Sequence, residues 1–220
     1  MNIIKEACVE SIKEAKAAEL QKADRVELCS RLDLDGLTPS RSIVKEAINS
    51  LTIPVKVMIR PKDGDFIYSK KDITKMRSEI DFCKSIGVGE VVFGVLNKNG
   101  QVDIDLTHLL AKEALPMKVT FHKAIDDTID IILELKRLSK VKEVTSILTS
   151  GGKDSALNGQ DTIKQIITEF SSRFNIISAG GITDINFDLV HNSIEGTEYH
   201  GKRIVGQLDK IKSLMCSEIS

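Results

Sequence analysis

The chain alternates short apolar runs with longer amphipathic stretches about eight times, and this alternation constrains its fold more than any other feature. Each unit is roughly thirty residues long, the length of one β-strand followed by one α-helix. Buried parallel strands are short and rich in Val, Ile or Phe, as most of these runs are. The predicted strands are Ile3–Val9, Arg25–Cys29, Val55–Arg60, Val91–Leu96, Lys118–His122, Val144–Thr149, Asn175–Ser178 and Thr197–His200.

The stretches between these strands carry helical periodicity. In Ile73–Ile86 apolar residues recur at three- and four-residue spacings, which places them on one face of a helix. Cys83 is one of them, so we expect it to be a small core side chain rather than a ligand. The other predicted helices are Ser11–Lys22, Thr128–Leu138 and Asp161–Phe170, with a short closing helix within Gly206–Cys216.

Eight strand–helix units favour a closed barrel over an open, doubly wound α/β sheet. The open sheet normally carries a glycine-rich turn after its first strand, whereas Cys8, Val9 and Glu10 occupy that place here. Neither GxGxxG nor GxxxxGK[ST] occurs, and no linker or low-complexity segment interrupts the chain. We therefore predict an α/β protein with one (β/α)8 TIM-barrel domain over residues 1–220.

Composition excludes several classes of function. The formal net charge is -1, from 31 basic and 32 acidic residues, so no positive field attracts nucleic acid or a membrane surface. The N-terminus lacks the pattern of a secretory signal peptide. The cysteines are scattered and form no CxxC pair, which is typical of reduced thiols in a cytosol. We expect a cytoplasmic protein with neither nucleic acid nor membrane among its partners.

Polar residues collect where the predicted strands end. In a (β/α)8 barrel the carboxyl ends of the strands and the loops after them form the functional site. Alternation of side chains along a strand makes Glu6 face the same way as Cys8, and Glu27 the same way as Cys29. The candidate site residues are Glu6, Cys8, Glu27, Cys29, Arg60, His122, Ser150, Gly151, Gly152, Gly180, Gly181 and His200.

One interpretation of this rim is an enzyme that acts on a small anionic metabolite. Arg60 and His200, together with the loops containing Ser150–Gly152 and Gly180–Gly181, would bind its phosphate or carboxylate group. Glu27 or Glu6 would act as general base, and His122 would be the acid–base partner. The same carboxylates with His122 would also suit a divalent metal ion. A structural ion-pair network of Glu6, Glu27 and Arg60 is the alternative.

The rim segments resemble the CutC family in order and spacing. They are EACVES, ADRVELCSRLDLDGLTPS, VMIRPKDGDFIYS, VVFGVLNKNGQVD, VTFHKAIDD, ILTSGG and AGGI, and the match extends from Ile4 to about His200. Short pieces such as AGGI are unspecific, but ELCS, GLTPS, MIRP and FHKA in series are highly specific. The resemblance implies a (β/α)8 barrel, cytosolic residence, a homodimer and a role in copper homeostasis.

The residues themselves support a copper hypothesis at one place. Cu(I) prefers soft thiolate and thioether ligands. Cys8 and Cys29 lie on adjacent predicted strands and face the same way, so their sulfurs are candidates to bind one Cu(I) ion, with Met58 as a further ligand. A copper-binding protein and an enzyme of anionic metabolites are therefore the two functions predicted from the sequence.

Overall fold

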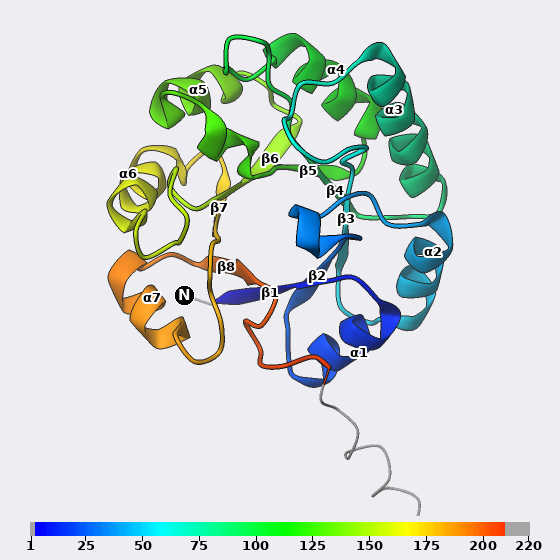
Figure 1. Ribbon diagram of the computed structural model, residues 1–220, viewed down its shortest axis with the longest axis vertical. Helices are drawn as coiled ribbons and strands as arrows, with labels where there is room; N and C mark the ends of the chain where they lie inside the picture. The colour runs from blue at the N-terminus through cyan, green and yellow to red at the C-terminus, as the bar shows by residue number, and fades with distance from the viewer. Residues whose placement is uncertain (1–2, 210–220) are drawn as a thin grey trace, which may run out of the picture.

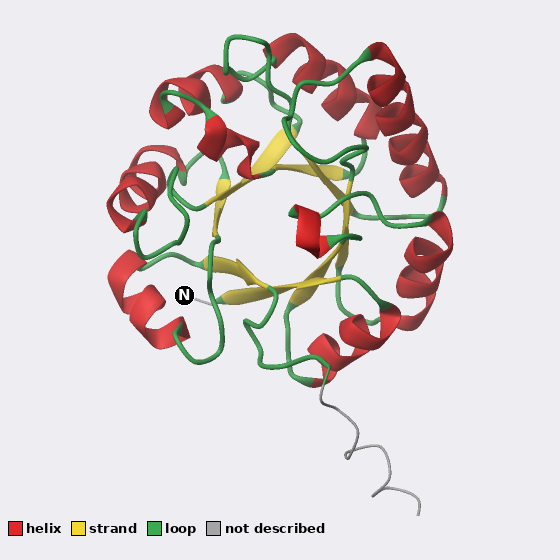
Figure 2. Cartoon of the chain, viewed as in Figure 1, coloured by secondary structure: helices red, strands yellow, loops and turns green. Residues whose placement is uncertain are grey.

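A computed structural model describes residues 3–209, and its centre is a closed barrel of eight parallel strands in the order β1 to β8. The helices form a ring around this barrel (Figures 1 and 2). The predicted (β/α)8 fold is confirmed. The strands are β1 (Ile4–Val9), β2 (Arg25–Leu28), β3 (Val55–Met58), β4 (Glu90–Phe93), β5 (Lys118–Phe121), β6 (Val144–Thr149), β7 (Asn175–Ser178) and β8 (Glu198–Gly201).

Seven α-helices and two short 3-10 helices are present within the described residues. The 3-10 helix η1 follows β2 and lies over the barrel opening in the view of Figure 1, whereas η2 follows β5. The helices are α1 (Ile12–Leu20), η1 (Leu32–Leu34), α2 (Arg41–Ser50), α3 (Lys70–Ser85), α4 (Ile104–Ala114), η2 (Lys123–Asp127), α5 (Ile131–Leu138), α6 (Gln160–Phe170) and α7 (Phe187–Ile194).

Side chains near the helix starts explain where several helices begin. Ser11 caps α1 by accepting a hydrogen bond from the Glu14 backbone N–H at 3.2 Å. Ser69 and Asp72 form a reciprocal capping box at the start of α3. Cys83 lies on the buried face of α3 and is 1% exposed, as expected for a core side chain.

The element boundaries differ from the sequence expectations in a few places. Cys29, Arg60 and His122 were expected to end strands, but each lies one or two residues beyond a strand end. They therefore belong to the loops over the barrel mouth. The predicted helix Thr128–Leu138 begins at Ile131 because Asp130 caps it there. Of the closing helix expected within Gly206–Cys216, residues 206–209 are non-helical and the remainder lies outside the described residues.

The strands turn alternate side chains toward the barrel axis and toward the helices. On β3, Val57 joins the large apolar cluster between strands and helices, whereas Lys56 and Met58 are also buried but lie outside that cluster. The barrel interior therefore holds polar and sulfur-bearing side chains beside a few apolar ones, while the main apolar core surrounds it. No helix within residues 3–209 has both the length and the apolar character that crossing a membrane requires.

Candidate metal and ligand site at the barrel mouth

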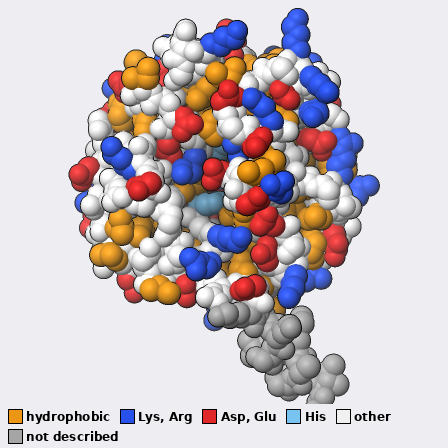
Figure 3. Space-filling view, viewed as in Figure 1, with side chains coloured by type: hydrophobic (Ala, Val, Ile, Leu, Met, Phe, Trp, Pro, Cys, Tyr) orange, Lys and Arg blue, Asp and Glu red, His pale blue; other side chains and the backbone are white. Residues whose placement is uncertain are grey.

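The carboxyl ends of the strands open into a pocket of about 850 Å³. Figure 3 looks into this end of the barrel, where both basic and acidic side chains surround a hollow with histidine at its floor. Of the predicted site residues, Glu6 and Gly151 do not line the pocket. Those that line it are Cys8, Glu27, Cys29, Arg60, His122, Ser150, Gly152, Gly180, Gly181 and His200.

Two thiols meet on one side of the pocket. The Sγ atoms of Cys8 and Cys29 lie 3.8 Å apart, and the two residues are 6% and 0% exposed. Met58 and Val92 complete a small buried cluster with them, and Leu32 of η1 packs against it. The two thiols therefore lie in an apolar setting at the edge of a polar pocket.

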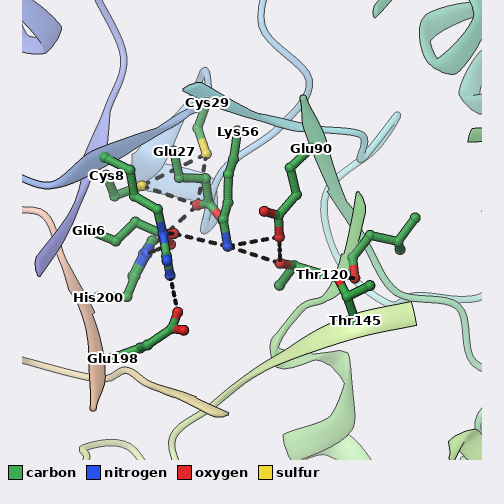
Figure 4. Close-up of polar contacts among 12 residues, drawn as sticks. Glu6, Cys8, Glu27, Cys29, Lys56, Glu90, Thr120, Thr145, Glu198 and His200 are labelled. Atoms are coloured by element: carbon green, nitrogen blue, oxygen red, sulfur yellow. Dashed lines mark hydrogen bonds and ion pairs between the residues drawn. The ribbon is translucent and has the colours of Figure 1, made fainter. Parts of the chain in front are cut away.

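A carboxylate and an imidazole complete this thiol group. Oε2 of Glu27 lies 3.5 Å from Sγ of Cys8 and 3.3 Å from Sγ of Cys29. Nε2 of His200 lies 3.8 Å from the same Glu27 oxygen. One ligand atom each from Cys8, Glu27 and His200 lies within 4.8 Å of the others, which is close enough for one metal ion. Figure 4 shows these side chains pointing toward one another.

The thiols and His200 have perturbed proton affinities. A hydrogen bond from the Cys29 thiol, aided by His200, lowers the pKa of Cys8 despite burial. The same hydrogen bond and burial raise the pKa of Cys29 well above its usual value. Burial lowers the pKa of His200, but Glu27, Cys8 and Glu6 together outweigh it and hold that pKa well above 6.5. Of the two thiols, Cys8 is therefore the one that loses its proton more readily.

Glu6 lies beneath the pocket and is 1% exposed. Its carboxylate pairs with Arg25, with Nζ of Lys56 at 3.1 Å and with Nδ1 of His200 at 2.7 Å. Lys56 also contacts Glu90 at 3.0 Å (Figure 4). Glu6 is thus held in buried ion pairs and orients the His200 ring, which favours a supporting role over that of a general base.

Arg60 does not join these ion pairs. Its guanidinium donates to the carbonyl oxygens of Leu34 at 2.7 Å, Gly36 at 3.1 Å and Gly64 at 3.0 Å. No described carboxylate lies within 4.0 Å of it, so the alternative of a Glu6–Glu27–Arg60 ion-pair network is wrong. Arg60 fixes two loops over the mouth through its backbone contacts.

His122 is a hydrogen-bond donor at the pocket. Its Nδ1 accepts a hydrogen bond from the Ala124 backbone N–H at 3.2 Å, so Nε2 carries the proton of the neutral ring. Burial, followed by the charge of Arg60, lowers the pKa of His122 to about 3. The ring therefore stays neutral near pH 7, which favours hydrogen-bond donation over the predicted proton transfer.

The loop after β6 was predicted to bind an anion, but the carboxylate of Asp126, a residue of η2, fills it. This carboxylate accepts hydrogen bonds from the backbone N–H groups of Ser150 at 2.8 Å and Gly152 at 2.9 Å, and from the Thr149 hydroxyl. The Gly151 N–H donates to the Thr149 hydroxyl oxygen at 2.9 Å. The protein's own carboxylate thus uses the donors that an external anion would need.

Replacing Asp126 with alanine should lower the free energy of unfolding by about 2–4 kcal/mol, because several buried donors lose their acceptor at about 1 kcal/mol or more each. Urea unfolding monitored by circular dichroism measures this change. Asp105→Ala, at an exposed position of α4, is the control and should stay within about 0.5 kcal/mol of the wild type. Equal stability of the two variants would contradict this role of Asp126.

The loop after β7 places Gly180 and Gly181 at the pocket wall with φ angles of 105° and 69°. These angles favour glycine. A Cβ at Gly180 would also lie 3.0 Å from the Ala156 backbone nitrogen, so the turn needs glycine for space as well. Both residues border the pocket beside His200, and their predicted contact with an anion stays a prediction.

The group of possible metal ligands in the structure differs from the carboxylates and histidine predicted to bind a divalent ion. Glu6, Glu27 and His122 do not form one group within the described residues, because Glu6 is enclosed by cations and His122 lies over β5. The group that does meet is Cys8, Glu27 and His200, with Cys29 and Met58 beside it. Its sulfur content favours a soft metal ion.

These features define a (β/α)8 barrel whose mouth holds paired thiols, a carboxylate and an imidazole. The CutC family model matches residues 3–205, and the chain belongs to that family. A human relative, "Copper homeostasis protein cutC homolog", is 40% identical over 89% of this chain and 71% of its own length. A CutC family protein of Pasteurella multocida is 36% identical over 89% of this chain and 80% of its own length.

Solved structures agree with this assignment. A CutC crystal structure from Streptococcus agalactiae superposes with a TM-score of 0.86 at 27% identity, covering 92% of this chain and 99% of that chain. A phosphoribosyl anthranilate isomerase from Thermococcus kodakaraensis has a TM-score of 0.58 at 15% identity, covering 91% and 87%. The second likeness shows the barrel fold alone.

Proposed function

We propose that this protein binds one Cu(I) ion between Cys8 and Cys29 at the barrel mouth. The observation that carries the proposal is the 3.8 Å separation of two buried sulfurs on neighbouring strands. Thiolates are preferred ligands of Cu(I), and two sulfurs at this separation can reach one ion with small side-chain movements. The thioether of Met58, in the same buried cluster, is a candidate third ligand.

The charges around the thiols fit a Cu(I) ion. Cu(I) with two thiolates carries a net charge of minus one, and the imidazolium of His200 beside Cys8 offsets it. Cys29 must lose its proton when it binds the metal, and Glu27 Oε2 lies 3.3 Å away in position to accept it. Leu32 covers the cluster and limits the access of water to the bound ion.

The names of relatives support a role in copper homeostasis. Human and mouse relatives carry the description "Copper homeostasis protein cutC homolog", at 40% and 39% identity. We infer a protein that holds copper for storage or transfer, since two ligands at the ends of neighbouring strands leave one side of the ion open to the pocket. Cytoplasmic residence and a homodimer stay predictions.

X-ray absorption at the copper K-edge of the Cu(I)-loaded protein tests the ligand set. We expect sulfur scatterers to dominate the first shell, with two from cysteine and a third if Met58 binds. Met58→Leu distinguishes two sulfurs from three, and Cys83→Ala should leave the spectrum unchanged because Cys83 lies in α3. A first shell made only of nitrogen and oxygen would show that the Cys8–Cys29 pair is not the copper site.

A further inference from the structure

Arg60 is a buried cation with no carboxylate oxygen within 4.0 Å of it in the described chain. It is 4% exposed, and each of its three hydrogen bonds is accepted by a backbone carbonyl oxygen. The other buried cations at the barrel centre are neutralised: Arg25 pairs with Glu6 and Glu198, and Lys56 pairs with Glu6 and Glu90. Arg60 therefore differs from Arg25 and Lys56 in its electrostatic surroundings.

A buried charge is costly unless an opposite charge compensates it. Carbonyl dipoles hold the Arg60 guanidinium in place, but they do not neutralise it. Its Nε–H also has no acceptor among residues 3–209. The guanidinium lines the 850 Å³ pocket, so an anion that entered from solvent would supply both the missing charge and the missing acceptor.

A second unpaired donor lies close by. Nε2 of His122 carries a proton, is buried, and has no hydrogen-bond partner in the described part of the chain. The ring of Phe66 packs against both groups, 4.9 Å from Cζ of Arg60 and 4.8 Å from the centre of the His122 ring. A cation and a neutral donor thus flank one aromatic surface at the pocket wall.

We propose that this wall binds a small organic anion, whose carboxylate or phosphate group is held by Arg60 and His122 beside Phe66. The pocket volume of about 850 Å³ suits a small molecule and far exceeds what a metal ion needs. This anion site lies over β3 and β5, whereas the thiol group lies over β1, β2 and β8. The anion site is therefore independent of the copper proposal. It also differs from the anion site predicted in the loop after β6, which the carboxylate of Asp126 fills.

The test uses inorganic phosphate and malonate as probes of the two kinds of anionic group. Binding of each to the full-length, metal-free, reduced protein is measured by isothermal titration calorimetry, with sodium chloride maintaining equal ionic strength. We expect saturable binding of at least one probe and at least ~10-fold weaker binding for Arg60→Met, because a charge-assisted bidentate contact is lost. Phosphate binding alone would indicate a phosphate ester as the natural ligand, and malonate binding alone a carboxylate.

Matched variants separate recognition from folding. His122→Asn keeps an acceptor for the Ala124 N–H but removes the distal donor, so it should weaken binding, whereas His122→Gln should restore part of it. Lys62 is a nearby cation that pairs with Asp65 and does not line the pocket. Lys62→Met should therefore bind both probes like the wild type. Absence of saturable binding of either probe, or equal losses in Arg60→Met and Lys62→Met with native circular dichroism, would overturn the proposal.

Discussion

Glu6→Gln should lower the free energy of unfolding by about 3–5 kcal/mol, because it removes one partner from a buried set of ion pairs. Arg25 and Lys56 would both lose a carboxylate that is 1% exposed, and the Nδ1–H of His200 would lose its charged acceptor. Glutamine keeps the size of the side chain, so the change reports charge. Urea unfolding at pH 7 measures it, and Glu46→Gln on the exposed face of α2 is the control.

The dependence on pH gives the same prediction a second readout. Burial raises the pKa of Glu6, but Lys56, His200 and Arg25 outweigh it and hold that pKa well below 4.5. The carboxylate therefore contributes stability that is present above about pH 4.5 and is lost as the pH falls through the lower folded-state pKa. Glu6→Gln should lose less stability than the wild type on acidification. Parallel pH profiles for the two proteins would contradict the assigned role of Glu6.

The barrel could be predicted from the sequence because its strands are short, apolar and evenly spaced. β6 and β7 have the predicted bounds, Val144–Thr149 and Asn175–Ser178. No bounds were predicted from the sequence for the helices α2, α4 and α7. Strand ends were predicted one or two residues too late at Arg60 and His122, since sequence pattern does not show where barrel hydrogen bonding stops.

Most of the predicted site residues line the barrel mouth, but which of them contact one another could not be predicted. Side-chain alternation correctly placed Cys8 and Cys29 on one side of the barrel wall, yet the 3.8 Å between their sulfurs depends on the folded structure. Whether a buried glutamate acts as a general base or only forms ion pairs depends on which side chains contact it, and these come from strands far away in the sequence. Glu6 meets Lys56 and His200, which are far from it in sequence.

Sequence reasoning missed Lys56 and the role of Asp126. A signal for Lys56 was present, because a lysine inside the strand run VKVM must be buried, and a buried lysine needs carboxylate partners. Asp126 gave no such signal, since it lies outside the predicted strands and next to a second aspartate, Asp127. Its function emerges only from the approach of the Ser150–Gly152 backbone.

Replacing both Cys8 and Cys29 with serine should weaken Cu(I) binding by at least ~100-fold, more than the loss of an outer-shell partner commonly costs. Hydroxyl oxygen is a hard ligand that Cu(I) does not prefer. The remaining candidates, Met58 and His200, offer one soft thioether and an imidazole that is protonated. Serine is close in size to cysteine, and the cluster keeps Val92 and Leu32, so the fold should persist.

The same double variant also separates the two proposals for the mouth. Arg60 and His122 lie over other strands, so binding of phosphate or malonate should survive the loss of both thiols. Conversely, Arg60→Met should still bind Cu(I). Loss of both activities in either variant, with a native circular dichroism spectrum, would show that copper and anion share one site.

The most direct test of the central claim is an anaerobic titration in which the protein competes for Cu(I) with a chromophoric chelator. The account predicts one tightly bound Cu(I) per chain in the wild type and in Cys83→Ala, and its loss in Cys8→Ser/Cys29→Ser. Weak binding by the wild type, or equal binding by the double variant, would contradict a copper site at Cys8 and Cys29.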